Sequence, residues 1–87
     1  MNIAVWDTYV KREDGLQMHF DILVPSSLKD TDQIYEFANQ YLNQKDFKVE
    51  DVRTSRCQFC HIEQATEETV RAVAKKGFDI IEFENCY

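Results

Sequence analysis

The feature that most restricts the fold of this chain is a pair of apolar stretches separated by a short polar turn. In residues 16–24 apolar side chains occupy every second position, and residues 3–10 have the same strand-forming composition. Between them lies Arg12-Glu13-Asp14-Gly15, in which Gly15 can take the left-handed conformation that closes a three-residue loop. These signals predict an antiparallel β-hairpin, which ends at Pro25 because proline cannot donate a ladder hydrogen bond.

A three-residue loop also determines which residues of the hairpin lie opposite one another. Asp7 then pairs with Asp21 and Tyr9 with His19, on one face. The other face is apolar and carries Ala4, Trp6, Val10, Met18, Phe20, Ile22 and Val24. We therefore predict a polar cluster of Asp7, His19 and Asp21, whose groups can act as acid, base or metal ligands. A solvated polar face without a site is the alternative, and a one-residue change in the loop would reverse the assignment.

Two helices and two more strands follow the hairpin. Asp30 can cap the first helix, whose apolar stripe is Ile34, Phe37, Ala38, Tyr41 and Leu42. Thr66 and Gly77 mark the start and the end of the second helix. Residues 56–63 and 78–84 are predicted as strands, with a polar connection over residues 46–55.

The predicted order ββαβαβ indicates a single α+β domain over residues 1–87. The simplest architecture that buries both apolar helix stripes is a four-stranded mixed sheet with two helices packed on one face. At 87 residues the chain is within the size range of one domain, and its two glycines and one proline argue against a disordered linker.

The charge balance excludes several kinds of partner. The formal net charge is −6, from 16 acidic and 10 basic residues, with no run of lysine or arginine to attract phosphate groups. We therefore expect neither nucleic-acid binding nor association with a membrane surface. The chain as given has no apolar leader and no segment near the roughly 20 apolar residues of a membrane span, so a cytoplasmic location is expected.

The most reactive stretch of the chain is Cys57-Gln58-Phe59-Cys60-His61. In a reducing compartment its cysteines are expected to be thiols or metal ligands rather than a disulfide. Zinc takes four sulfur and nitrogen ligands. If Cys57 and Cys60 lie in a tight turn, they can form such a shell with the late Cys86 and one histidine, His61 or the distant His19. This hypothesis predicts a zinc site at Cys57, Cys60, His61 and Cys86.

Other chemistry fits the same stretch. Cys-x-x-Cys-His is also the attachment motif of c-type haem, but haem attachment is typical of exported proteins. A thioredoxin-like dithiol needs a helix N-terminus, and the next predicted helix starts several residues later. In a regular strand, Cys57, Phe59 and His61 would point one way and Cys60 the other, making Cys60 an ordinary core residue.

Three groups of motifs together resemble a small bacterial family that is known only as a domain of unknown function. They are Val5-Trp6-Asp7-Thr8-Tyr9-Val10, Met18-His19-Phe20-Asp21, and Cys57-Gln58-Phe59-Cys60-His61 with Cys86. The resemblance covers nearly the whole chain and implies a stand-alone α+β domain of bacterial origin. It implies no activity, substrate or cofactor.

The sequence is consistent with three classes of function. The first is a metal-binding or thiol-bearing module. The second is a small thiol-dependent or acid–base enzyme that uses Cys60 or Cys57 with His61. The third is a homodimeric interaction module that associates through a sheet edge, or through apolar side chains on the face opposite the core, namely Ile3, Val5, Tyr9 and Leu23.

Overall fold

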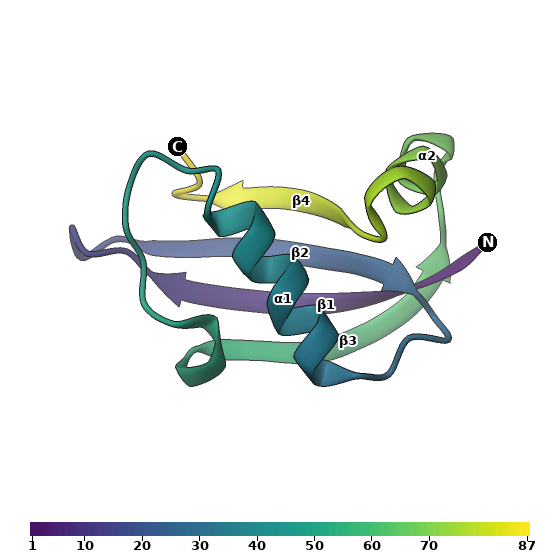
Figure 1. The fold of residues 1–87 in the computed structure, drawn as a ribbon, viewed down its shortest axis with the longest axis horizontal. Coiled ribbons are helices and arrows are strands. Elements are labelled where there is room, and N and C mark those ends of the chain that lie inside the picture. The colour runs from purple at the N-terminus through teal and green to yellow at the C-terminus, as the bar shows by residue number, and fades with distance from the viewer.

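The computed structural model describes all 87 residues, Met1–Tyr87. Figure 1 shows a four-stranded sheet with one helix lying diagonally across it. The elements are β1 (Asn2–Lys11), β2 (Gln17–Pro25), α1 (Thr31–Leu42), the 3-10 turn η1 (Val52–Thr54), β3 (Arg56–Gln64), α2 (Glu67–Lys76) and β4 (Asp79–Glu84). The predicted α+β class and the predicted order of elements are confirmed. None of the helices is long and apolar enough to cross a membrane.

The sheet is antiparallel throughout, so the prediction of a mixed sheet is wrong. The strand order is β3-β1-β2-β4, and all three neighbouring pairs run antiparallel. The physical reason lies in the crossing from β3 to β4, which carries the chain from one edge of the sheet to the other (Figure 1). The two later strands therefore never become neighbours, and each pairs with a strand of the hairpin that runs in the opposite direction.

The central hairpin has the predicted register. Arg12 N donates to Leu16 O at 2.8 Å, and Gly15 takes the left-handed conformation at φ 92°. Asp7 lies opposite Asp21, and the predicted core side chains face α1. Five of these core residues are completely buried: Val10, Met18, Phe20, Ile22 and Val24. This burial holds the register in place, since a slip of one residue would turn them all to the other face.

Helix α1 covers one face of the sheet, as predicted. The Asp30 side chain caps it by accepting from Asp32 N at 3.0 Å. Its predicted apolar stripe packs into the core, where Ile34, Ala38, Tyr41 and Leu42 are buried and Phe37 is partly buried. We call the face under α1 the covered face and the opposite one the open face.

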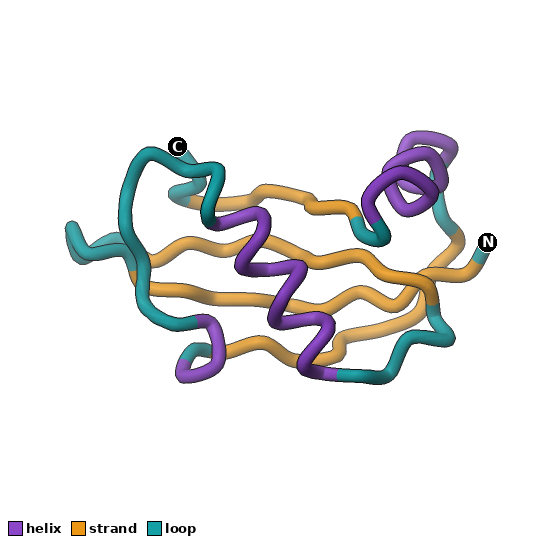
Figure 2. Tube along the Cα trace, in the orientation of Figure 1, coloured by secondary structure: helices purple, strands orange, loops and turns teal.

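Helix α2 does not lie beside α1 over the sheet, which corrects the prediction that both helices pack on one face. Figures 1 and 2 show it at one end of the sheet, beside the start of β4. Thr66 caps it as predicted, and Thr69 Oγ1 donates to Asp79 Oδ2 at 2.9 Å. Gly77 ends it in the left-handed conformation. With only Thr69 and Val73 buried, α2 has too narrow an apolar stripe to cover a sheet face.

The connection from α1 to β3 is more ordered than the sequence indicated. Val52 of η1 is completely buried in the core. Upstream of it, Glu50 N donates to Lys11 O and Glu13 N to Lys48 O, so this segment runs along the hairpin turn. The Arg12 guanidinium stacks over the Phe47 ring at 3.7 Å. A single buried valine in a polar stretch gives no periodic signal, so this part was not predictable from pattern.

Candidate functional site

The predicted polar cluster is present in the middle of the open face. Asp7 on β1 lies opposite Asp21 on β2, and His19 lies one open-face position along from Asp21. His19 Nε2 is 2.7 Å from Asp7 Oδ1, a contact in which the carboxylate oxygen accepts. One ligand atom from each of Asp7, His19 and Asp21 can be chosen so that all three lie within 4.8 Å of one another. We call this group the Asp–His–Asp cluster.

The imidazole of His19 is held from both sides by aromatic rings. The Tyr9 ring stacks on it with a centroid separation of 4.2 Å and an interplanar angle of 8°. The Phe83 ring covers the other side at 4.7 Å and 22°. Only 21% of the His19 side chain is exposed. Stacking and the Asp7 contact therefore fix both the plane and the rotation of the ring, which pre-organises its nitrogen atoms.

Both edge strands depart from regular pairing at the level of this cluster. On one side the register of β1 and β3 shifts between Val5 and Trp6, which leaves Cys60 as the extra residue of β3. On the other side the register of β2 and β4 shifts between His19 and Phe20, which leaves Phe83 unpaired in β4. Bulges re-aim side chains and are common next to active sites. Here the second bulge supplies the ring that covers His19.

The electrostatics of the cluster favour a bound positive charge. Partial burial and the neighbouring charge of Asp7 raise the pKa of Asp21 from 3.8 to about 6. The positive charges of protonated His19 and His61 lower the pKa of Asp21. His61 is therefore close enough to affect the cluster, and it lies opposite Val5 on the open face. Two carboxylates at close range with few counter-charges are stabilised by a proton or a cation.

The four residues of the predicted zinc shell are not brought together. The Cys57 thiol lies on the covered face, where Thr8 Oγ1 donates to it at 3.4 Å. The Cys86 thiol is buried and donates to His19 O at 3.5 Å, near β4 rather than β3. Cys60 is exposed, next to His61. The Asp–His–Asp cluster is the only group of three or more potential metal ligands whose ligand atoms converge.

The bulge also contradicts the alternative in which β3 is a flat strand, because the residues after Cys60 face the side opposite to the one expected. Ile62 lies opposite Ala4 and so shares the covered face with Cys57 and Phe59, while His61 faces the open side. Cys57, not Cys60, is the thiol that packs on the core, and burial raises the pKa of that thiol. Cys60 Sγ lies 3.1 Å from His61 Nδ1. This pair is exposed, and its surroundings do not fix it as they fix His19.

Three of the four apolar side chains predicted for association through the open face are buried. Ile3, Val5 and Leu23 are 1%, 1% and 2% exposed, and they form a small second core with Ala65. Tyr9 is partly covered by its stack with His19. The open face therefore offers polar groups at its centre, and of these four residues only Tyr9 retains accessible surface.

Phe83 and the two bulges are the parts of the site that sequence reasoning missed. A bulge leaves no signal in one short strand, because the extra residue is recognised only against the register of the neighbouring strand. The run Asp79-Ile80-Ile81-Glu82-Phe83-Glu84 contains adjacent isoleucines, so its alternation does not tell which face Phe83 occupies.

The comparisons with known proteins agree with the fold and name no activity. A family model described as "Domain of unknown function (DUF2024)" matches residues 1–83. The NMR structure of protein NE1680 from Nitrosomonas europaea, a structural-genomics target, is similar with a TM-score of 0.76 and 37% sequence identity, over 100% of both chains. No curated protein matches the sequence. The family resemblance recognised in the motifs is thus confirmed.

Proposed function

This chain belongs to the family described as domain of unknown function (DUF2024), and we propose that it is a module that binds one divalent metal ion at Asp7, His19 and Asp21. The observation that carries the proposal is the convergence of the three ligand atoms to within 4.8 Å of one another around a clamped histidine. Ligands of a single zinc ion, bound at about 2.0–2.2 Å, lie roughly 3–4 Å apart. The limit of 4.8 Å is somewhat wider than this spacing, and a bound ion would draw the two carboxylates closer together.

The chemistry of the ligand set indicates which ions to test. Imidazole nitrogen with carboxylate oxygen suits zinc and other first-row divalent ions, whereas calcium and magnesium prefer oxygen alone. Zinc is therefore the first candidate. Three protein ligands leave a coordination position for water or a small molecule, as in catalytic rather than structural zinc sites.

The raised pKa of Asp21 affects cation binding in two ways. Burial of the carboxylate, followed by the charge of Asp7, raises the pKa of Asp21 to about 6, and a divalent ion would offset both effects by neutralising the carboxylates. It would also compete with the proton at Asp21, because a metal ligand must be deprotonated. We therefore expect zinc affinity to fall as the pH is lowered through about 6.

The direct test is calorimetric titration of zinc into untagged, metal-free protein at pH 7.5. We expect one ion per chain. Asp21→Ala and His19→Ala should each weaken binding by about 100-fold, since each removes a side chain that would bind the ion directly. Cys60→Ser is the matched control for the cysteine-based site and should change affinity less than about threefold. Loss of binding in Cys60→Ser with retention in Asp21→Ala would reject the Asp–His–Asp cluster in favour of Cys60 and His61.

A second candidate function is thiol chemistry at Cys60. It is supported by the 3.1 Å contact between Cys60 Sγ and His61 Nδ1 and by the exposure of this cysteine. Cys57 and Cys86 serve as internal references because both thiols pack on the core. Iodoacetamide at pH 7.5 should label Cys60 at least about 100-fold faster than either, as measured by peptide mass spectrometry. Equal rates for Cys60 in native and denatured protein would show exposure without activation.

We propose a cytoplasmic location, supported by three free cysteines of which one is exposed. We also propose that nucleic acid is not a partner, supported by the net charge of −6.

A further inference from the structure

The sheet has two free edges, and they differ in charge. β4, at one edge, carries three acidic residues in its six positions: Asp79, Glu82 and Glu84. A second copy of this strand would meet it with like charges. β3, at the other edge, carries one arginine and one glutamate near opposite ends, Arg56 and Glu63. Charged edge strands resist pairing, so β4 is protected and β3 is the edge open to a partner.

The bulge at Cys60 makes β3 complementary to itself. Arg56 and Glu63 are an odd number of residues apart, and in an uninterrupted strand they would point to opposite faces. Because Cys60 is an extra residue, Arg56 lies opposite Tyr9 and Glu63 opposite Ile3, and both face the open side. Two copies of β3 related by a two-fold axis perpendicular to the sheet can therefore place the arginine of one opposite the glutamate of the other.

We propose that the free edge of β3 is a self-association surface at which two copies of the chain pair antiparallel, with Arg56 opposite Glu63 of the partner subunit. The same register sets Cys57 opposite Ile62 of the partner subunit, and both of these side chains lie on the covered face. The arginine–glutamate pair occurs twice by symmetry. Each pair provides a local attraction that opposes the overall repulsion between two chains of net charge −6.

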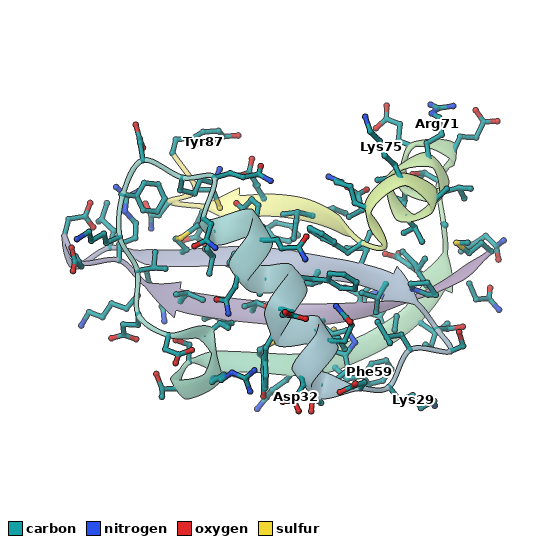
Figure 3. All side chains as sticks on the ribbon, in the orientation of Figure 1. Lys29, Asp32, Phe59, Arg71, Lys75 and Tyr87 are labelled. Atoms are coloured by element: carbon teal, nitrogen blue, oxygen red, sulfur yellow. The ribbon has the colours of Figure 1, made fainter.

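The covered-face side of this edge supplies apolar surface for the contact. Phe59 and Ile62 are 52% and 49% exposed, although both lie on the face that packs the core elsewhere. Figure 3 shows Phe59 at this edge of the molecule, near Lys29, which lies in the connection just before α1. With Trp6 and Leu28, these side chains line a groove of about 360 Å³. In the proposed register, Phe59 lies next to the two-fold axis and Ile62 lies opposite Cys57 of the partner subunit, so both side chains lose part of this exposure.

The proposal is tested by charge reversal and charge swap. Sedimentation equilibrium of the full chain should show a monomer–dimer equilibrium. Arg56→Glu and Glu63→Arg should each raise the dimer Kd about tenfold or more, because each places two like-charge pairs in the interface. The double variant Arg56→Glu/Glu63→Arg should return the Kd to within about threefold of the original. Far-UV circular dichroism checks that each variant is folded.

A second measurement reports the register itself. Cys60 lies next to the proposed two-fold axis and is the exposed cysteine of the chain. A short bis-maleimide should therefore join Cys60 to Cys60 of the partner subunit, and Cys60→Ser should abolish the cross-link. A strict monomer at several hundred micromolar would overturn the proposal. So would a dimer that the charge swap does not restore and that Cys60 does not cross-link, because its interface would lie elsewhere.

Discussion

The central hairpin and strand β3 carry the two groups of reactive side chains in this molecule, and they constrain those groups very differently. On the hairpin, His19 is enclosed by Tyr9, Phe83 and Asp7. On β3, His61 contacts its own neighbour Cys60 and, at 3.8 Å, Glu63. The exposed fractions of the two histidine side chains are 21% and 51%.

The difference follows from the position of each strand in the sheet. β1 and β2 are paired on both sides, so a side chain at the centre of the open face has neighbours in four directions. β3 is paired on one side only. A functional constellation needs side chains held by their surroundings, so the hairpin rather than the Cys-x-x-Cys-His stretch is the better place for one.

The largest expected difference between the two regions concerns deletion of a single residue. Deleting Cys60 removes the bulge and leaves Phe59 opposite Trp6 and His61 opposite Val5, so the free energy of unfolding should change by no more than about 1 kcal/mol. Deleting His19 shifts the alternation of β2 by one residue. Either Met18, on one side of the deletion, or the core residues on the other side, from Phe20 onward, must then turn to the open face. The loss should be at least about 3 kcal/mol, measured by urea denaturation.

Deletion of Ser27, in the connection after β2, is the matched control for shortening the chain outside the sheet. It should cost less than the deletion of His19. Similar losses for the Cys60 and His19 deletions would contradict the view that β3 tolerates changes of register that the hairpin does not.

The same contrast explains what the sequence could predict. The hairpin register followed from period-2 alternation and Gly15, because a central strand must alternate to bury one face. The Asp–His–Asp cluster followed directly from that register. The zinc shell at Cys57, Cys60, His61 and Cys86 depended instead on the path of an edge strand and of the chain end. Neither path is restricted by a strong apolar pattern. The extended conformation of β3 keeps Cys57 and Cys60 apart, and Cys86 lies beside β4 at the other edge of the sheet.

A smaller effect is expected from loosening the clamp around His19. Phe83→Ala removes the ring stacked at 4.7 Å while leaving all three proposed metal ligands in place. Zinc affinity should fall about tenfold, because groups that orient a ligand contribute 10–100-fold. Phe59→Ala removes an aromatic ring of similar exposure on β3 and is the control. Calorimetric titration that gives equal affinities for both variants would show that the stack does not position His19 for a metal.

The pH dependence of stability should show an effect of about 1 kcal/mol at Asp21. Its pKa is raised from 3.8 to about 6 in the folded state, so the proton stabilises the fold. This stabilisation is complete below pH 3.8 and is lost as the pH rises through about 6. If the whole pKa shift contributed to the free energy of unfolding, the effect would be about 3 kcal/mol. Because this carboxyl is partly exposed and screened by solvent, we expect about 1 kcal/mol.

Asp21→Asn should therefore stabilise the metal-free protein by about 1 kcal/mol at pH 8 and have little effect at pH 4. Urea denaturation in the presence of a chelator, at both pH values, measures this difference. Glu67→Gln, on the exposed side of α2, is the control for removing a carboxylate. If Asp21→Asn instead lowers the free energy of unfolding at pH 8, then the ionised carboxylate is stabilised by its neighbours more than it is destabilised by burial and by the charge of Asp7.

The smallest effect should come from His61, and it completes the comparison of the two histidines. His61→Ala removes a side chain that is 51% exposed, so the free energy of unfolding should change by less than about 0.5 kcal/mol. His19→Ala removes two ring stacks and the Asp7 contact, so it should cost about 1–2 kcal/mol. Both variants are measured by urea denaturation at pH 7 with a chelator present. If His61→Ala costs as much as His19→Ala, then β3 holds its histidine as firmly as the hairpin does, and Cys60 with His61 becomes the better candidate site.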